Sequence, residues 1–180
     1  MNIYDKVEIG CGKTKRTGFF GIDVALLPGV DLVADIDKEG IPLPDNSVGH
    51  MLFVHSLEHF SDFLFIVSEI WRTCRHKACV DIYAPYYTNM INLSNPYHKV
   101  HLTEYTFLFF TDKVKKVSTG YRLSRGSANE QNKICFRQEE VQFVYFEPWD
   151  SKSKEEQDFA RLHYMHVVRD MYIRLRVIKS

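Results

Sequence analysis

Short apolar segments that each end in glycine or aspartate fill the first part of this sequence and restrict what the chain can fold into. Residues 4–9 lead into Gly-Cys-Gly, and residues 19–24 and 31–36 each end near an aspartate. The longer apolar segment 49–57 is typical of a strand buried on both faces of a parallel sheet. These patterns predict parallel strands that end in tight turns and polar side chains.

After these segments, helix patterns and strand patterns alternate along the chain. Residues 58–75 carry apolar side chains at helical spacing, and residues 78–83 return to a strand pattern before Pro85. Beyond a long connection over 86–106, we expect a short helix over 107–114, strands over 117–122 and 141–146, and a long C-terminal helix over 154–176. Because the chain shows no repeat or linker, we predict one α/β domain over residues 1–180.

Composition excludes several classes of protein. Basic and acidic residues number 23 each, so the strongly basic footprint of a nucleic-acid binder is absent. No apolar stretch approaches the ~20 residues of a membrane span, and no secretory leader opens the chain. The four cysteines form no C-x-x-C pair and are expected to be reduced. We therefore expect a cytoplasmic protein that binds neither nucleic acid nor membrane.

Three strand ends carry residues suited to ligand binding. Gly10 and Gly12 allow a sharp turn and a close approach of a ligand to the main chain. Asp23 stands where nucleotide-binding folds place an acid that binds ribose hydroxyls, and Asp35 ends the next predicted strand. Each feature alone is common in turns, but open α/β sheets bind ligands where such strand ends meet.

With these residues the sequence resembles the class I S-adenosylmethionine-dependent methyltransferases, in particular small, type 11-like members with a shortened start. The resemblance runs from Val7 to Phe60 and fades after Phe107. It implies a Rossmann-like, mostly parallel sheet and S-adenosylmethionine as cofactor. The matching segments are Glu8–Gly12, Gly21–Asp23, Asp31–Ile36, Leu43–Ser47 and His55–His59.

The resemblance also implies roles for individual residues. Gly10 and Gly12, with Cys11 between them, would contact the methionine moiety, and Glu8 would orient this loop. Asp23 would hold the ribose. Asp35 and Ile36 would border the adenine, and His55 would lie beneath the sulfonium. Between positions 23 and 69 nine residues are acidic and one is basic, which suits a cationic ligand or an ordinary solvated surface.

One departure from the family concerns the first helix. The connection between the first two strands is shorter than the dozen or more residues that a parallel crossover usually takes. We therefore expect the first helix to be shortened or missing, which would leave one face of the sheet bare. As a hypothesis, the C-terminal helix or a second subunit covers that face, the latter making the protein a homodimer.

Candidate catalytic residues lie after the fifth strand, where the acceptor pocket is expected. His98 and His101 are candidates for a general base, with Glu104 nearby. The segment Asn95–His98 resembles one in relatives that modify cell-surface sugars, so we expect a small-molecule or glycan hydroxyl as the acceptor. His55 and His59 are four residues apart, but no third ligand at a known spacing accompanies them, so we predict no metal site.

Two alternatives remain open. A nicotinamide-dependent dehydrogenase also uses a glycine turn and an acid, but it needs a helix N-terminus behind the glycines for the pyrophosphate. A catalytically inactive methyltransferase fold that serves as a binding or scaffold protein is compatible with the absent third glycine and first helix. Retention of Glu8, Asp23 and Asp35 favours cofactor binding over this alternative.

Overall fold

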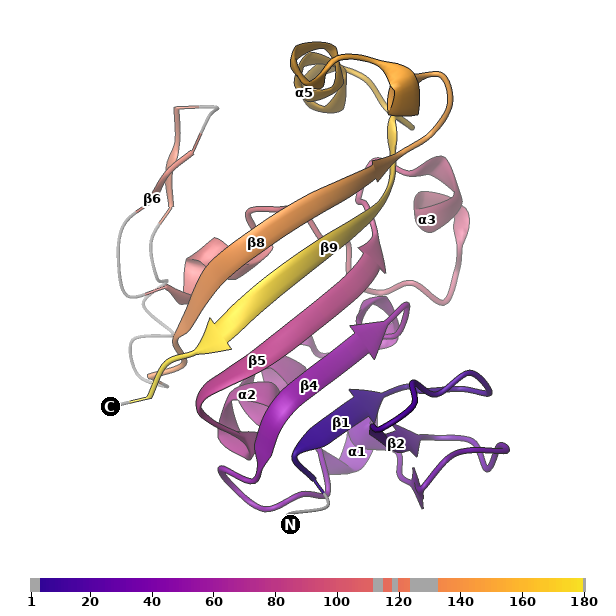
Figure 1. Ribbon diagram of the computed structural model, residues 1–180, viewed down its shortest axis with the longest axis vertical. Coiled ribbons are helices and arrows are strands. Elements are labelled where there is room, and N and C mark those ends of the chain that lie inside the picture. Colours follow the sequence, from indigo (N-terminus) through magenta and orange to yellow (C-terminus); the bar gives the residue numbers. More distant parts are fainter. Residues whose placement is uncertain (1–3, 112–114, 118–119, 124–132, 180) are drawn as a thin grey trace.

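A mixed sheet of seven strands, in the order β3-β2-β1-β4-β5-β9-β8, forms the centre of the molecule (Figure 1). The computed structural model describes residues 4–111, 115–117, 120–123 and 133–179. Strands β1 to β5 run parallel, β9 is antiparallel to β5, and β8 is antiparallel to β9. The strands are β1 (Lys6–Ile9), β2 (Phe20–Asp23), β3 (Leu32–Val33), β4 (Val48–Val54), β5 (Cys74–Pro85), β8 (Phe136–Tyr145) and β9 (Val168–Val177). This confirms the predicted α/β architecture.

The helices α1 and α2 lie behind the sheet in the view of Figure 1. Helix α2 starts after Asp62, whose side chain accepts a hydrogen bond from the main-chain N–H of Phe65 at 2.9 Å. Its buried side chains, Ile66, Val67 and Ile70, join the apolar core under the sheet. None of the helices in the described ranges is long and apolar enough to span a membrane. The helices are α1 (Ile36–Glu39), η1 (Leu57–His59), α2 (Phe63–Thr73), α3 (Met90–Ser94), η2 (Thr106–Phe110), η3 (Trp149–Ser151) and α5 (Lys154–His163).

The first helix is missing, as expected from the short connection. Residues 10–19, all of which the structure describes, form turns, and β1 pairs directly and in parallel with β2. Side chains take over the positioning that a helix would provide. Glu8 accepts a hydrogen bond from the main-chain N–H of Arg16 at 2.6 Å, and Asp31 accepts from Lys15 Nζ at 2.5 Å. These two carboxylates hold the loop against the sheet.

The predicted long C-terminal helix is wrong. The helix α5 ends at His163, and the chain then returns through the sheet as β9. The reason is a change of period: from Ile173 to Val177 the side chains alternate between buried apolar and more exposed arginine ones, which is the period of a strand. The stripe that includes Phe159, His166, Met171 and Ile178 therefore does not lie on one helix.

The face of the sheet toward the viewer in Figure 1 carries no helix, and α5 lies beyond the ends of β8 and β9 instead of over it. Asp81 on this face accepts hydrogen bonds from Tyr172 Oη at 2.8 Å, and from Nε and Nη2 of Arg174 at 2.8 and 3.0 Å. Burial raises the pKa of Asp81, but hydrogen bonds from His50, Arg174 and Tyr172 outweigh it and hold that pKa well below its usual range. A polar face of this kind can border water directly. The C-terminal helix therefore does not cover it, and a covering second subunit stays a prediction.

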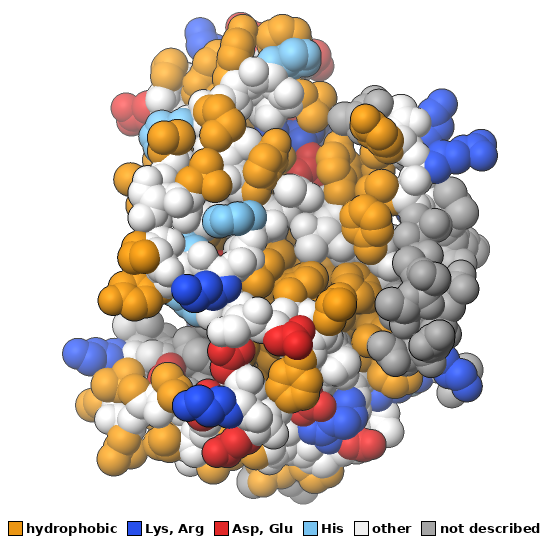
Figure 2. All heavy atoms as spheres, turned by 180° about the vertical axis from the view of Figure 1, so that it is seen from behind, with side chains coloured by type: hydrophobic (Ala, Val, Ile, Leu, Met, Phe, Trp, Pro, Cys, Tyr) orange, Lys and Arg blue, Asp and Glu red, His pale blue; other side chains and the backbone are white. Residues whose placement is uncertain are grey.

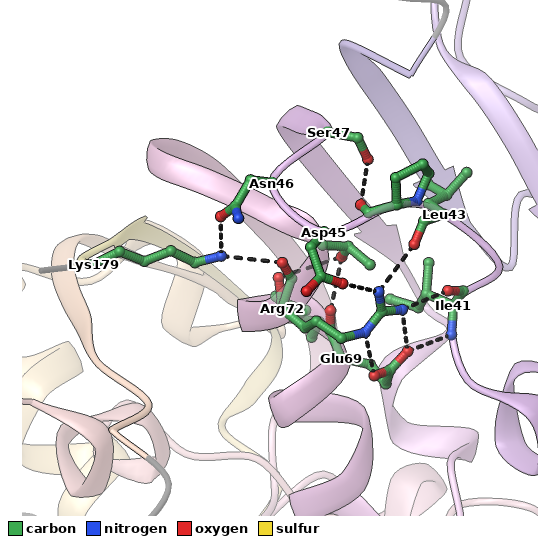
Figure 3. Close-up of polar contacts among 11 residues, drawn as sticks. Ile41, Leu43, Asp45, Asn46, Ser47, Glu69, Arg72 and Lys179 are labelled. Atoms are coloured by element: carbon green, nitrogen blue, oxygen red, sulfur yellow. Dashed lines mark hydrogen bonds and ion pairs between the residues drawn. The ribbon is translucent and has the colours of Figure 1, made fainter.

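Arg72 on α2 fixes the segment that leads from α1 into β4 (Figure 3). Its guanidinium donates to both carboxylate oxygens of Glu69 at 2.7 Å each and to Asp45 at 2.5 Å. It also donates to the main-chain oxygens of Ile41 at 2.8 Å and Leu43 at 3.0 Å. The hydrogen bonds from Arg72 hold the pKa of Glu69 below its usual range, although burial opposes this.

The matching segment Leu43–Ser47 is thus structural. Ser47 Oγ donates to the carbonyl oxygen of Pro44 at 2.7 Å, and Ser47 N donates to that of Thr73 at 2.9 Å. Asn46 adopts a positive φ of 55° and accepts a hydrogen bond from Lys179 Nζ at 2.5 Å (Figure 3). The turn therefore positions the start of β4, and with it the carboxyl end of that strand.

The second half agrees only in part with the sequence-based expectations. The predicted strand over 141–146 is confirmed as part of β8, and the connection over 86–106 contains α3. The helix expected over 107–114 is the shorter η2, and residues 112–114 of that prediction lie outside the described residues. In place of one strand over 117–122 there are two-residue strands, β6 (Lys115–Lys116) and β7 (Arg122–Leu123), and residues 118–119 also lie outside the described ranges.

Candidate functional site

A cavity of about 490 Å³ lies at the carboxyl ends of β1, β2 and β4. Open α/β sheets bind ligands at this edge, and the volume falls within the ~300–1,000 Å³ of typical ligand pockets. Three carboxylates and two histidines surround an otherwise mainly apolar interior. The lining residues are Ile9, Gly10, Ile22, Asp23, Val24, Ala34, Asp35, Ile36, Asp37, His55, Ser56, His59, Phe60 and Tyr97.

Gly10 forms the floor where β1 ends. Its φ of 66° lies in the left-handed region, and a Cβ at this position would lie 2.5 Å from the Cβ of Ser56. Ser56 is itself fixed, because its hydroxyl donates to the carbonyl oxygen of Ile9 at 2.7 Å. Only glycine therefore leaves the main chain open to a ligand at this point.

Asp23 lines the cavity and also shapes the loop beside it. Its Oδ2 accepts from Gly12 N at 2.8 Å, and its Oδ1 accepts from Ala25 N at 2.9 Å. A carboxylate has about four lone-pair positions, so each oxygen can still accept from a ligand hydroxyl. Gly12 and Cys11 do not line the cavity. Cys11 is buried, and burial, with the charges of Asp23 and Glu8, raises its pKa to about 11.

The other predicted ligand residues fall into two groups. Asp35 and Ile36 line the cavity, and no main-chain N–H among the described residues donates to the Asp35 side chain, which pairs with Lys38 at 2.7 Å. Glu8 lies behind the cavity, buried beneath the loop that it holds, and burial raises its pKa despite a hydrogen bond from Arg16 N. Glu8 therefore holds the loop at Arg16, and its role in orienting the glycines stays a prediction.

His55 leaves β4 with an unusual backbone. Its φ of 49° is uncommon for a residue with a side chain, and such strain concentrates at functional sites. Its main-chain N–H donates to the Tyr83 carbonyl at 2.8 Å, which fixes the half-exposed imidazole at the cavity. A nearby Glu58 carboxylate raises the pKa of His55. This shift favours the protonated, positively charged form of His55 at the cavity.

The candidate bases lie near the cavity but do not line it. His98 packs its ring edge-on against His59, with ring centroids 4.8 Å apart, and burial lowers its pKa. His101 is exposed. Glu104 is buried and pairs with Arg161 of α5 while accepting from Tyr86 Oη at 2.8 Å, so it fastens α5 to the sheet.

Sequence reasoning missed the wall that the cavity shares with the segment after α3. The main-chain N–H groups of Lys99 and Val100 donate to the carbonyl oxygen of Glu58 at 2.7 and 3.1 Å. This contact brings Tyr97 to the cavity beside His59 and Phe60. It joins residues about 40 positions apart in the sequence, and no local pattern signals it. The face behind the sheet, where this segment runs, shows several histidine side chains gathered along one side (Figure 2).

Comparison with known proteins gives structural relatives only. No protein-family model matches the sequence, and no curated protein matches it. An S-adenosylmethionine-dependent methyltransferase from Archaeoglobus fulgidus superposes with a TM-score of 0.60 at 16% identity, over 96% of this chain and 88% of that one. The YcgJ protein of Bacillus subtilis gives 0.55 at 13% identity, over 97% and 91%. The [4+2]-cyclase SpnF gives 0.52 at 13% identity, over 97% and 74%.

These likenesses cover nearly the whole chain at identities too low to carry an activity across. They agree with the mostly parallel sheet of this chain. The chain therefore has the fold of the class I S-adenosylmethionine-dependent methyltransferases.

Proposed function

We propose that this protein binds S-adenosylmethionine in the cavity and is a methyltransferase acting on a hydroxyl of a small molecule or sugar. The observation that carries the proposal is the convergence of Gly10, Asp23 and Asp35 on one cavity at the carboxyl edge of the sheet. The fit is supported by Gly10, where a Cβ would meet Ser56, and by carboxylates suited to a cation and to ribose hydroxyls.

The residues divide the binding among them. Asp23 would accept from the ribose hydroxyls, Asp35 and Ile36 would border the adenine, and Gly10 would leave its main chain open to the methionine moiety. When bound, S-adenosylmethionine supplies an electrophilic methyl group on its sulfonium. The protein then contributes chiefly alignment of the acceptor oxygen with that methyl, which is a large part of the rate in such displacements.

The acceptor hydroxyl must also lose a proton as its oxygen gains the methyl. His98 and His101 are our candidates to take it, since a histidine has a pKa near the working pH. Burial lowers the pKa of His98 and so favours the neutral imidazole, the form that a base requires. The preference for a hydroxyl of a sugar or other small molecule rests on the Asn95–His98 segment of the sequence.

Calorimetric titration with S-adenosylmethionine and S-adenosylhomocysteine tests the cofactor part. The sharpest variant is Asp35→Ala, because this side chain holds no main-chain N–H group and its loss should leave the fold intact. Loss of a hydrogen bond to a charged group is worth about 1.5–3 kcal/mol, so we expect binding ~10- to 100-fold weaker. Asp23→Asn tests the ribose contact while keeping one acceptor oxygen for Gly12.

Asp150→Ala, an exposed carboxylate on η3 outside the cavity, is the matched control and should bind like the wild type. Absence of binding by folded wild-type protein would refute the methyltransferase proposal and favour a binding or scaffold role on this fold. Where binding is present, incubation with methyl-labelled cofactor and panels of sugars and phenols tests the acceptor class. Transfer of the methyl group to amines but not to hydroxyls would contradict the proposed class of acceptor.

A further inference from the structure

A cluster of possible metal ligands lies beside the cavity. One ligand atom each from Glu58, His59 and His98 lies within 4.8 Å of the others. Glu58 and His59 belong to η1, and His98 belongs to the segment that the carbonyl of Glu58 holds in place. Since His59 also lines the cavity, the cluster and the proposed cofactor site share a wall.

The carboxylate of Glu58 is the anomaly in this cluster. Its residue is only 1% exposed, and neither carboxylate oxygen has a hydrogen-bond partner among the described residues. The Nδ1 of His55 lies 3.7 Å from Oε1, beyond hydrogen-bond length. His55 is thus an ionic neighbour of Glu58, but it is half exposed and does not hydrogen-bond the carboxylate. Burying a carboxylate that accepts no hydrogen bond is strongly unfavourable. A cation bound between this carboxylate and the histidines would compensate its buried negative charge.

The two histidines are oriented as metal ligands usually are. His59 Nδ1 lies 3.1 Å from the carbonyl oxygen of Tyr97, which can only accept, so Nδ1 carries the proton. His98 Nδ1 lies 2.6 Å from Asn92 Oδ1, and Asn92 Nδ2 in turn donates to the Tyr86 carbonyl at 3.1 Å. In the neutral form of each ring these contacts leave Nε2 unprotonated, and a hydrogen bond on the other ring nitrogen is the arrangement usual behind a metal site.

We propose that Glu58, His59 and His98 bind one divalent first-row metal ion, with Zn²⁺ or Mn²⁺ as the representative ions. Imidazole nitrogen and carboxylate oxygen suit these ions, and two histidines with one carboxylate leave coordination positions open. Ligand atoms about 2.0–2.2 Å from an ion lie at most about 4.4 Å apart, so small side-chain rotations would close the site. His55 is placed to approach as a further ligand.

The second cluster of possible metal ligands lies on the uncovered face of the sheet, and its carboxylate is already hydrogen-bonded. It consists of His50, Cys79 and Asp81, and the Asp81 carboxylate already receives two hydrogen bonds from Arg174 and one from Tyr172. An arginine that neutralises the carboxylate leaves no charge for an ion to compensate. Of the two clusters found among the described residues, the Glu58 cluster is therefore the one whose carboxylate accepts no hydrogen bond.

The role of the ion in catalysis rests on the proposed function, whereas the binding of the ion does not depend on it. Because His55 and His59 line the cavity, open coordination positions would face the space where an acceptor enters. An acceptor oxygen bound there would lose its proton more readily, as oxygen ligands of metals do. While His98 coordinates the ion it cannot serve as general base, which leaves that role to His101.

The test is calorimetric titration of the full chain, freed of metal by a chelator, with Zn²⁺ and with Mn²⁺. We expect one ion per chain. Removing a hydrogen bond behind a metal ligand typically weakens binding ~10- to 100-fold, so Glu58→Gln and His98→Ala, which remove ligands, should each weaken it at least ~100-fold. His163→Ala, an exposed histidine of α5, is the matched control and should leave affinity unchanged.

A second readout is the visible absorption of bound Co²⁺, which reports its ligands and should change in His98→Ala. Glu58→Gln should fold, because it removes a buried charge that accepts no hydrogen bond, and circular dichroism checks this. No saturable ion binding to folded wild-type protein, or equal binding by Glu58→Gln and wild type, would overturn the proposal. Titrating metal-free protein with S-adenosylmethionine separates the two ideas, since Asp35 and Asp23 do not depend on the ion.

Discussion

Replacing Arg72 by methionine should lower the free energy of unfolding by about 3 kcal/mol. The Arg72 guanidinium is the counter-ion of Glu69, whose side chain is only 12% exposed. Without it, the Glu69 carboxylate keeps a single hydrogen bond, from Ile41 N at 2.9 Å. Breaking one partner of a buried pair is worth about 3–5 kcal/mol. Because Arg72 is itself 34% exposed, water can replace part of what is lost, which sets the lower end of the range.

Urea unfolding followed by circular dichroism measures this loss, and a parallel thermal melt should show a Tm about 6–12 °C lower. The matched control is Arg75→Met, because Arg75 pairs with Asp5 while both side chains are about half exposed. Exposed pairs contribute about 0–1 kcal/mol, so this control should lose little. Equal losses in the two variants, both below about 1 kcal/mol, would refute the reasoning that Arg72 holds a buried charge.

The ion pair between Arg72 and Glu69 also predicts that the free energy of unfolding depends on pH. The pKa of Glu69 is lowered in the folded protein, so its contribution is fully present above the unfolded value of ~4.3. As the pH falls through the lower folded pKa, the carboxylate takes up a proton and the contribution is lost. Unfolding free energies of wild type and Arg72→Met should therefore converge below about pH 4. Curves that stay parallel down to pH 3 would contradict the assignment.

Three further variants address other parts of the molecule. Gly10→Ala should abolish cofactor binding in calorimetry and lower the Tm, because its Cβ would lie 2.5 Å from the Cβ of Ser56 and its φ is 66°. Glu104→Gln should lower the free energy of unfolding by up to ~3–5 kcal/mol in urea, since it leaves the buried Arg161 with only the half-exposed Asp158, at 3.4 Å, as a counter-ion; a loss below ~1 kcal/mol would contradict this. Asp81→Asn should destabilise less, because Arg174 is 38% exposed and water can solvate it, and a Tm at least as low as that of Glu104→Gln would contradict this.

The first half of the fold could be predicted because its signals are local. Glycine and aspartate mark where β1, β2 and β3 end, and a buried apolar run marks β4. The cavity residues Gly10, Asp23 and Asp35 follow from those ends, since parallel strands bring their carboxyl ends to one edge. The missing first helix followed from chain length alone.

The second half could not be predicted in the same way. Apolar residues between 159 and 178 fit a helical stripe loosely, and a strand pattern only after Met171. What decides between them is pairing with β5, for example Ile82 with Ile173, a contact that spans about half of the chain. Likewise, Tyr97 reaches the cavity, and His98 reaches His59, through main-chain bonds to Glu58. These are consequences of tertiary packing that no short window contains.

The antiparallel course of β9 has a practical consequence for studying the protein. The cavity opens at the carboxyl ends of the parallel strands, whereas β9 runs the other way, so that Arg176 pairs with Cys79 near the start of β5. Both Lys6, at the start of β1, and Val177, at the end of β9, therefore lie toward the opposite edge of the sheet (Figure 1). An affinity tag, a fluorophore or a sensor surface attached at either end would leave the entrance to the cavity free.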